Sequence, residues 1–259
     1  MVLVDDHKET VRREFTRQAT TFTPAGWASA GVDWIVDQVG PIVGEQVLEV
    51  AAGAAHLGLA LAARAAHVTA LDLTAAVLEQ GKLAAEAAGR RNLVFQVGDA
   101  ANLPYLDESF DVVVSRLSVH HFDDPQAPVS EMVRVCRKAG RLVLVDMIAL
   151  DDSASPRDRL ERLRDPSHTR TRTLAGLCSL VENAGAAVLS RQTRENPLRL
   201  RDWLDRTRTP GPARAEIEAA LRAELVAGPS TGLRPELRDG ELWFTHEWAA
   251  IVATPLPAA

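Results

Sequence analysis

Short apolar runs alternate with helical patterns over the first 150 residues of the chain. The apolar runs predict strands at residues 46–50, 68–72, 93–97, 110–115 and 142–148. Between them, apolar residues recur at helical spacing, and two of these segments end at Gly89 and Gly140. The run 110–115 is apolar at almost every position, as expected of a strand buried on both faces. Strands that alternate with helices predict an open, largely parallel α/β sheet.

The two ends of the chain follow other patterns. Helical spacing near the N-terminus predicts an amphipathic helix within residues 1–22, which includes Phe15 and Phe22, and a second helix at 27–39. Residues 151–172 are dense in Arg, Asp, Ser and Thr, which predicts a polar excursion. Beyond it we predict a helix at 173–184, a strand at 186–190, a charged helical pair at 197–227 and a last long strand at 241–253.

The stretch 46–72 has the layout of a nucleotide-binding strand–turn–helix–strand unit. Its first strand is followed by a turn of small residues, 51–55, and its second strand closes on Asp72. Small side chains allow the backbone to approach a ligand closely. Asp72 lies 19 residues after Gly53, where a carboxylate can accept both hydroxyls of an adenosine ribose. The unit therefore predicts a site for an adenosine-containing cofactor.

Composition narrows the class of protein. With 259 residues, 46% of them hydrophobic, the chain has material for a large core. A net charge of −6 argues against a nucleic-acid partner. Cys136 and Cys178 lack metal or redox spacing and fall in helical patterns, so we expect reduced, buried thiols. Without an opening signal peptide or a run of membrane-spanning length, the expectation is a soluble cytoplasmic protein.

Taken together and in order, several stretches resemble the class I S-adenosylmethionine-dependent methyltransferases, most closely the ubiquinone/menaquinone C-methyltransferase-like (type 11) group. They are VLEVAAGAAHLG (47–58), ALDLT (70–74), GDAANLPYLDESFDVVVSR (98–116), SVHHFDDP (118–125) and MVRVCRKAGRLVLVD (132–146). The resemblance implies a doubly wound, Rossmann-like sheet of seven strands with helices on both faces. The last strand would be antiparallel, inserted between the fifth and sixth. It also implies S-adenosylmethionine as cofactor and S-adenosylhomocysteine as product.

The same resemblance implies three parts of the chain. An N-terminal helical lid would span 1–40, a cofactor-binding βα core 41–150, and the C-terminal half of the sheet, with helical insertions on the substrate side, 151–259. The lid helix either covers the core or closes over the cofactor, and in the second case Phe15 and Phe22 would contact ligand. Many relatives have Tyr in the lid, so a hydroxyl contact would be missing here.

By resemblance, the turn with Ala51 and Gly53 would pass the methionine part of the cofactor, with Glu49 on the side of its amino group. Arg116 and Leu117, just past the fourth strand, would border the sulfonium and the substrate. Relatives usually have more glycine in the turn. The extra methyl groups of Ala51 and Ala55 would narrow the cofactor site or shift its backbone.

The adenosine part would lie against residues at the next two strand ends. Asp72 would hold the ribose, and Leu73 would pack on the adenine. Asp99 would accept a hydrogen bond from the adenine amino group, and the backbone amide of Ala100 would donate one to the ring.

Methyl transfer needs alignment in a dry pocket, and an O–H, N–H or acidic C–H acceptor also needs a base. His120 is the favoured candidate base and His121 the weaker one, because imidazole titrates near neutral pH. The alternative is that both histidines cap or pack the following helix. We expect no metal, since no glutamate flanks His120 and the other histidines lack ligand spacing.

Trp203 packs in the core or forms a wall of the substrate pocket, and Arg116 either pairs with a carboxylate or binds an anionic substrate group. The predicted partner is a small-molecule acceptor, quinone-like or a secondary metabolite. The sequence leaves the oligomeric state open, with a homodimer as one option.

Three other functions are compatible with parts of this pattern. A nicotinamide-dependent oxidoreductase is disfavoured because the single tyrosine, Tyr105, is followed four residues later by Ser109 rather than Lys. A nucleic-acid methyltransferase is disfavoured because residues 115–118 read SRLS and not an Asn/Asp-Pro-Pro-aromatic tetrad. A protein that binds S-adenosylmethionine but catalyses a non-methylating reaction such as cyclisation, or serves as a binding module, remains an alternative.

Overall fold

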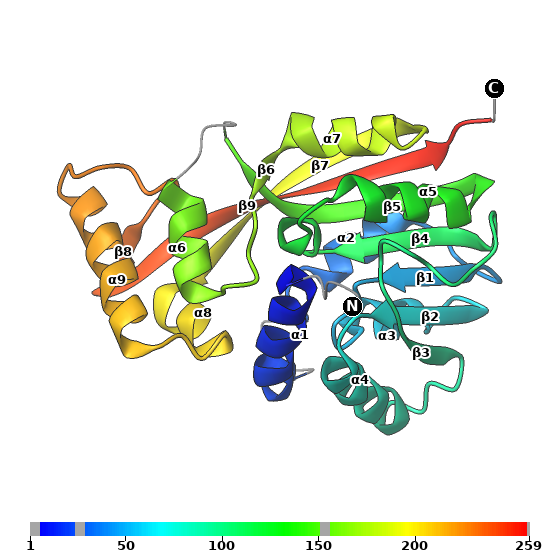
Figure 1. The fold of residues 1–259 in the computed structure, drawn as a ribbon, viewed down its shortest axis with the longest axis horizontal. Coiled ribbons are helices and arrows are strands. Elements are labelled where there is room, and N and C mark those ends of the chain that lie inside the picture. Colours follow the sequence, from blue (N-terminus) through cyan, green and yellow to red (C-terminus); the bar gives the residue numbers. More distant parts are fainter. Residues whose placement is uncertain (1–5, 24–28, 151–155, 258–259) are drawn as a thin grey trace.

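The structure is a computed structural model that describes residues 6–23, 29–150 and 156–257. One central sheet runs through the molecule in the order β3-β2-β1-β4-β5-β9-β7, with the short β6 beside β5 and β8 beside β9 (Figure 1). Its strands are β1 (Gln46–Val50), β2 (His67–Asp72), β3 (Leu93–Val97), β4 (Phe110–Arg116), β5 (Cys136–Ala149), β6 (Arg172–Thr173), β7 (Ala186–Arg199), β8 (Glu236–Arg238) and β9 (Glu241–Pro255). Pairing is parallel from β3 to β5, whereas β9 is antiparallel to both β5 and β7.

Helices cover both faces of this sheet because successive strand residues point to opposite sides. On one face α5 (Gln126–Val135) and α7 (Leu174–Asn183) bury Met132 and Val181 with Leu48 and Leu144. On the other face lie α2 (Val32–Val39), α3 (His56–Leu61) and α4 (Ala75–Ala87), around alternate residues of the same strands. The sheet is therefore doubly wound, as predicted.

The antiparallel pair β7–β9 continues past the core and carries a second hydrophobic cluster (Figure 1). Helices α6 (Pro156–Arg164), α8 (Leu200–Arg206) and α9 (Gly211–Leu225) pack there. The cluster centres on Trp203 and Phe244, whose rings lie 4.8 Å apart, together with Ile217 and Leu221. We call this extension the outer lobe.

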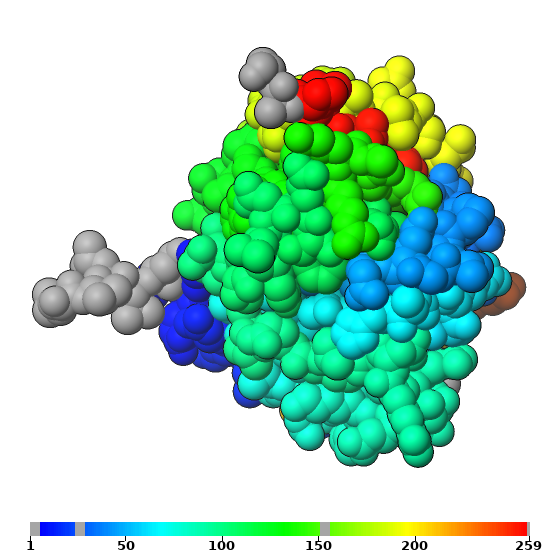
Figure 2. All heavy atoms as spheres, turned by 90° about the vertical axis from the view of Figure 1, so that its right-hand side faces the viewer, coloured from blue at the N-terminus to red at the C-terminus, as the bar shows by residue number. Residues whose placement is uncertain are grey.

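The N-terminal helix α1 (Asp6–Gln18) lies between the outer lobe and the ends of the parallel strands (Figure 1). The predicted start of the second helix, near Trp27, lies outside the described residues. Figure 2 views the opposite end of the core, where residues near the amino ends of the parallel strands form a rounded surface. The carboxyl ends of the strands thus face α1 and the outer lobe.

The strand count of seven was wrong, because the described residues form a sheet of nine strands. The seven-strand path is present, with β9 inserted as expected, and the two additional strands are only two and three residues long. Such short strands leave no periodic pattern in a polar segment. The supposed polar excursion also contains α6, whose charged residues include the buried Glu161.

Two further boundaries differ from the prediction. β7 runs to Arg199, well beyond residue 190. The prediction was too short because β7 is the outermost strand of the path, and its long exposed, charged stretch resembles a charged helix in sequence. Cys136 begins β5 rather than ending a helix, and both cysteines are buried. Among the described residues, no helix is long and apolar enough to cross a membrane.

Candidate functional site

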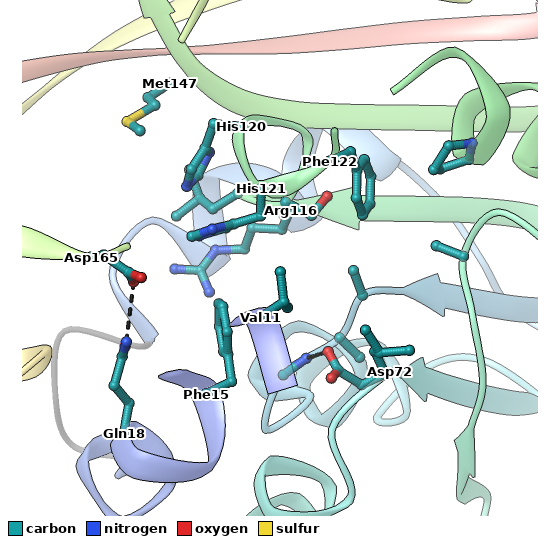
Figure 3. Close-up of a pocket in the computed structure, with 18 of the residues that line it drawn as sticks. Val11, Phe15, Gln18, Asp72, Arg116, His120, His121, Phe122, Met147 and Asp165 are labelled. Carbon is teal, nitrogen blue, oxygen red and sulfur yellow. Dashed lines mark hydrogen bonds between the residues drawn. The ribbon is translucent and has the colours of Figure 1, made fainter. Parts of the chain in front are cut away.

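A cavity of about 390 Å³ opens at the carboxyl edge of the sheet, between α1 and the outer lobe (Figure 3). Parallel strands of an open α/β sheet place their loops at this edge, where ligands usually bind. Most of the predicted site residues line it: Phe15, Phe22, Ala51, Gly53, Asp72, Leu73, Asp99, Ala100, Arg116, Leu117, His120, His121 and Trp203. The fold thus brings together residues that span almost 190 positions of the chain.

The turn after β1 is held in left-handed backbone. Ala51, Gly53 and Ala55 have φ angles of 53°, 55° and 51°. This conformation costs an L-residue about 1–2 kcal/mol, which explains the preference for glycine at such positions. The methyl group of Ala55 packs into the core on the α2–α3 face of the sheet and does not line the cavity, whereas Ala51 does. Only one of the two alanines therefore adds its methyl group to the cavity wall.

Asp72 is fixed at the tip of β2 by backbone amides. Its Oδ2 accepts a hydrogen bond of 2.8 Å from the amide of Gly53, and its Oδ1 accepts one of 2.8 Å from Thr74. The side chain is buried, and this burial raises its pKa above 3.8 although the two amides oppose the shift. Because each carboxylate oxygen has a second lone pair, the group can still accept hydrogen bonds from a ligand in the cavity.

Asp99 marks the end of the cavity nearest β3. Its Oδ1 accepts a hydrogen bond of 2.9 Å from the amide of Ala101, and its Oδ2 lies 3.1 Å from the ammonium of Lys8 on α1. The N-terminal helix therefore reaches across this end of the cavity. At the turn, a Cβ on Gly53 would lie 3.5 Å from the ring of Phe22, so this aromatic side chain covers the glycine.

Glu49 is the predicted cofactor residue that does not line the cavity. It is buried behind the turn, where its Oε2 accepts a hydrogen bond of 2.7 Å from the amide of Gly58. Burial raises the pKa of this carboxyl to about 8, against the opposing effects of the Gly58 amide and the positive charge of Arg116. Gly58 has no room for a side chain, since a Cβ would lie 2.6 Å from the carboxylate.

This raised pKa makes the stability of the ligand-free protein depend on pH. Glu49 titrates near 4.5 in the unfolded chain and near 8 in the fold, so its contribution is full below pH 4.5 and is lost as the pH rises through 8. We expect E49Q, whose amide oxygen can still accept from Gly58, to gain stability relative to wild type by a few kcal/mol, on the order of the shift, between pH 5 and 9. Urea unfolding at several pH values measures this. A stability difference that does not change with pH would contradict it.

His120 forms a buried dyad with Asp146, which lies within the apolar part of β5. Its Nδ1 lies 2.5 Å from Oδ1 of Asp146, and its backbone amide donates to Oδ2 at 3.2 Å. Burial by itself lowers the pKa of His120, but the charge and hydrogen bond of Asp146 outweigh it, so the pKa is raised above 6.5. The carboxylate thereby orients the ring with Nδ1 as donor, which leaves Nε2 as the nitrogen that can accept a proton.

His121 has a different environment. Its Nδ1 lies 3.0 Å from the hydroxyl of Ser167, and its ring meets Phe15 of α1 edge-on with centroids 5.0 Å apart. Burial, followed by the charge of His120, lowers its pKa to about 3. This histidine therefore stays neutral and packs between α1 and the loop after α6. Neither histidine caps α5, where Asp124 accepts from the amide of Gln126.

Arg116 lies at the end of β4 with its guanidinium 5.9 Å from the ring of Trp248. One of its nitrogens donates to the carbonyl of Ala30 at 2.9 Å. Burial lowers its pKa to about 10, although Glu49 opposes the shift. In Figure 3 its guanidinium points from the strand end toward the side of the cavity where Asp165 lies.

Several cavity residues were missed by the sequence analysis: Asp146, which is buried beneath the cavity, and Arg164, Asp165, Arg206, His246 and Trp248, which line it. Asp146 carried a usable signal, because it is the one charged residue within the apolar run LVLVDMIA of a predicted buried strand. The others belong to the outer lobe, and their place at the cavity depends on how β7 and β9 extend. No group of three or more potential metal ligands occurs within the described ranges.

Comparison with known proteins identifies the family. Residues 48–144 match a family described as methyltransferase domain. The chain is 33% identical over 174 residues to the uncharacterised methyltransferase YcgJ of Bacillus subtilis, covering 66% of this chain and 69% of YcgJ. The solved structure of YcgJ superposes with a TM-score of 0.80 at 26% identity, covering 88% of this chain and 99% of that one. A ubiquinone/menaquinone biosynthesis C-methyltransferase of Roseobacter denitrificans is 34% identical over 131 residues, 49% of this chain and 51% of that protein.

A doubly wound sheet with a tight turn after its first strand and an acid at the tip of its second defines a Rossmann-like, cofactor-binding α/β protein. The chain belongs to the class I S-adenosylmethionine-dependent methyltransferases, and it is an enzyme of that class with S-adenosylmethionine as its cofactor.

Proposed function

We propose that this enzyme methylates a small-molecule acceptor, quinone-like or a secondary metabolite, inside the cavity at the carboxyl edge of the sheet. The observation that carries the proposal is that one cavity joins two kinds of group. Asp72 and the turn 51–55 lie on one side of it, and His120, backed by Asp146, lies on the other. Methyl transfer to an acceptor atom that carries a proton requires a cofactor site next to an oriented base.

The residues that line the cavity would hold each part of S-adenosylmethionine. Asp72, oriented by two amides, would accept the ribose hydroxyls, and Asp99 with the amide of Ala100 would hold the adenine edge. Leu73 would pack on the ring, and Ala51 and Gly53 would lie along the methionine part. Leu117, with a φ of 52°, and Arg116 would border the sulfonium. Bound S-adenosylmethionine supplies a methyl group that is already activated for in-line displacement.

The residues of the chain position the acceptor and remove its proton. In-line displacement would leave the electron pair of the broken carbon–sulfur bond on sulfur, and the acceptor atom would form the new bond to the methyl carbon. His120 Nε2 takes the acceptor's proton, and Asp146 stabilises the resulting imidazolium. The base form of His120 predominates only above its raised pKa, so activity should increase with pH through that value.

The N-terminal helix would exclude water from this reaction. Gln18 donates to the buried Asp165 at 3.1 Å, and a ring nitrogen of His7 lies 2.7 Å from the carbonyl of His121. Together with Phe15 these contacts hold α1 over the cavity (Figure 3). A cavity closed in this way strengthens the electrostatic interactions inside it.

Transfer of a labelled methyl group tests the proposal. The purified protein is incubated with S-adenosylmethionine carrying a radiolabelled methyl group and with extracts or acceptor panels that include reduced quinones. We expect label in a small organic product, and mass spectrometry would show a gain of one methyl group. Binding of the cofactor without transfer to any acceptor would favour the alternative of a non-methylating reaction or a binding module.

The buried free cysteines support a reducing compartment, so we propose the cytoplasm as the location of this enzyme.

A further inference from the structure

Positive charge gathers on the side of the cavity formed by the outer lobe. Arg164 at the end of α6 and Arg206 at the end of α8 line this side, and Arg116 approaches from β4. This side is lined by residues of α6, the segment just after α6, α8, β7 and β9. Among the described residues of these segments that line the cavity, the carboxylate is that of Asp165. Three guanidinium groups therefore share one partly enclosed space with few negative charges.

Arg164 is held rigidly in this space. Its Nε donates to the carbonyl of Trp203 at 3.3 Å, and its guanidinium lies 4.6 Å from the centroid of the Trp203 ring. A third contact, of 3.3 Å, joins it to Oε2 of the buried Glu161. A guanidinium that is stacked and hydrogen-bonded loses little further freedom when it binds an anion.

Arg206 shows that the three charges influence one another. Burial and the repulsion from Arg164 and Arg116 together lower its pKa to about 10, and Asp202 partly opposes this shift. Like charges brought together in a poorly solvated space repel one another. A negatively charged group that bound among the three guanidinium groups would reduce this repulsion.

The nearby carboxylates offset part of this positive charge and also have other partners. Asp165 accepts hydrogen bonds from Gln18, at 3.1 Å, and from the amide and hydroxyl of Ser167. Glu161 lies 3.0 Å from a ring nitrogen of His246 and also contacts Arg164. Glu49 interacts with Arg116, but burial raises the pKa of the Glu49 carboxyl to about 8, which reduces its negative charge near neutral pH.

Apolar side chains also line this side, beside the polar Asn196 and His246. They come from five elements and are those of Phe15, Met147, Leu198, Trp203 and Trp248. An aromatic or aliphatic body would be removed from water there, with its charged group at the arginines. In the close-up, Met147 and His120 lie at the same end of the cavity.

We propose that the acceptor is an organic anion, with its carboxylate or phosphate at Arg164 and Arg206, its apolar body on Trp203 and Met147, and its methyl-accepting atom beside His120. The inference rests on the proposed function and narrows it. It favours acids and phosphate esters over neutral quinones.

Matched ligand pairs test this inference on the S-adenosylhomocysteine-loaded protein. A panel of aromatic and aliphatic carboxylic acids is screened against the corresponding primary amides, and phosphate monoesters against their parent alcohols, by ligand-observed NMR and calorimetry. We expect the anions to bind at least about tenfold more tightly than their neutral partners, since hydrogen bonds to charged groups are the strong ones. The two arms of the panel distinguish a carboxylate from a phosphate.

Two variants locate the site. R206Q should reduce anion binding about tenfold or more and leave the affinity for S-adenosylhomocysteine unchanged. R201Q on the same helix is the matched control, because the Arg201 side chain is 76% exposed and does not line the cavity. Equal binding of anions and neutral partners, no binding of any anion, or equal losses in both variants would overturn the inference. Failure to bind S-adenosylhomocysteine at all would instead count against the proposed function.

Discussion

Replacing Asp72 with alanine is expected to weaken S-adenosylhomocysteine binding by at least about a hundredfold. The carboxylate is aimed into the cavity by the amides of Gly53 and Thr74, and it would accept both ribose hydroxyls. Each hydrogen bond to a charged group contributes about 1.5–3 kcal/mol, so the loss of two accounts for this magnitude. Calorimetric titration of wild type and variant measures the effect directly.

The Asp72 variant needs a control because its carboxylate also orders the turn. D107A removes an aspartate that is 74% exposed and lies away from the cavity, so it should bind the ligand like wild type. Circular dichroism and thermal unfolding establish that D72A is folded. A folded D72A protein with unchanged affinity would show that the ribose is bound elsewhere.

The second large effect is expected for H120A, which should reduce kcat by about 10² to 10⁴ with a panel acceptor that carries an ionisable proton. Affinity for S-adenosylhomocysteine should stay within a few-fold of wild type, because the base contacts the acceptor and not the nucleotide. H67A is the matched control, since His67 begins β2 at the opposite edge of the sheet. A similar loss of kcat in both variants would argue against a role for His120 as base.

The pH profile separates proton transfer from packing. In wild type, kcat should rise through a pKa above 6.5, because Asp146 stabilises the protonated ring and only the neutral ring accepts a proton. D146N removes that negative charge, so the inflection should move to lower pH while kcat also falls. An unchanged inflection in D146N would mean that another group is titrating.

Much of the core could be predicted from the sequence because each element there obeys one local rule. Strands buried on both faces are almost entirely apolar, as in 110–115, and α4 ends just before Gly89 as predicted. The predicted helix end at Gly140 was wrong, because α5 ends at Val135 and Gly140 lies within β5. The outer lobe breaks these rules. β7 is an outermost strand with a charged, exposed stretch, and α6 buries Glu161 against His246, so hydrophobic periodicity does not reveal either.

The residues of the functional site divide in the same way between the core and the outer lobe. Asp72, Asp99 and His120 follow strand ends of the core, where topology alone places them at one edge. Arg164 and Arg206 come from separate helices of the outer lobe, more than 40 residues apart, and only tertiary packing brings them together. The sequence therefore predicts which residues gather at the strand ends, whereas it does not predict that these arginines line the same cavity.

Calorimetric titration of the wild-type protein with S-adenosylmethionine, S-adenosylhomocysteine and NAD tests the central claim most directly. The account predicts micromolar binding of both adenosyl ligands with one site per chain and no binding of NAD. Absence of binding by either adenosyl ligand, or tight binding of NAD, would contradict a methyltransferase cofactor site at Asp72 and the turn that follows β1.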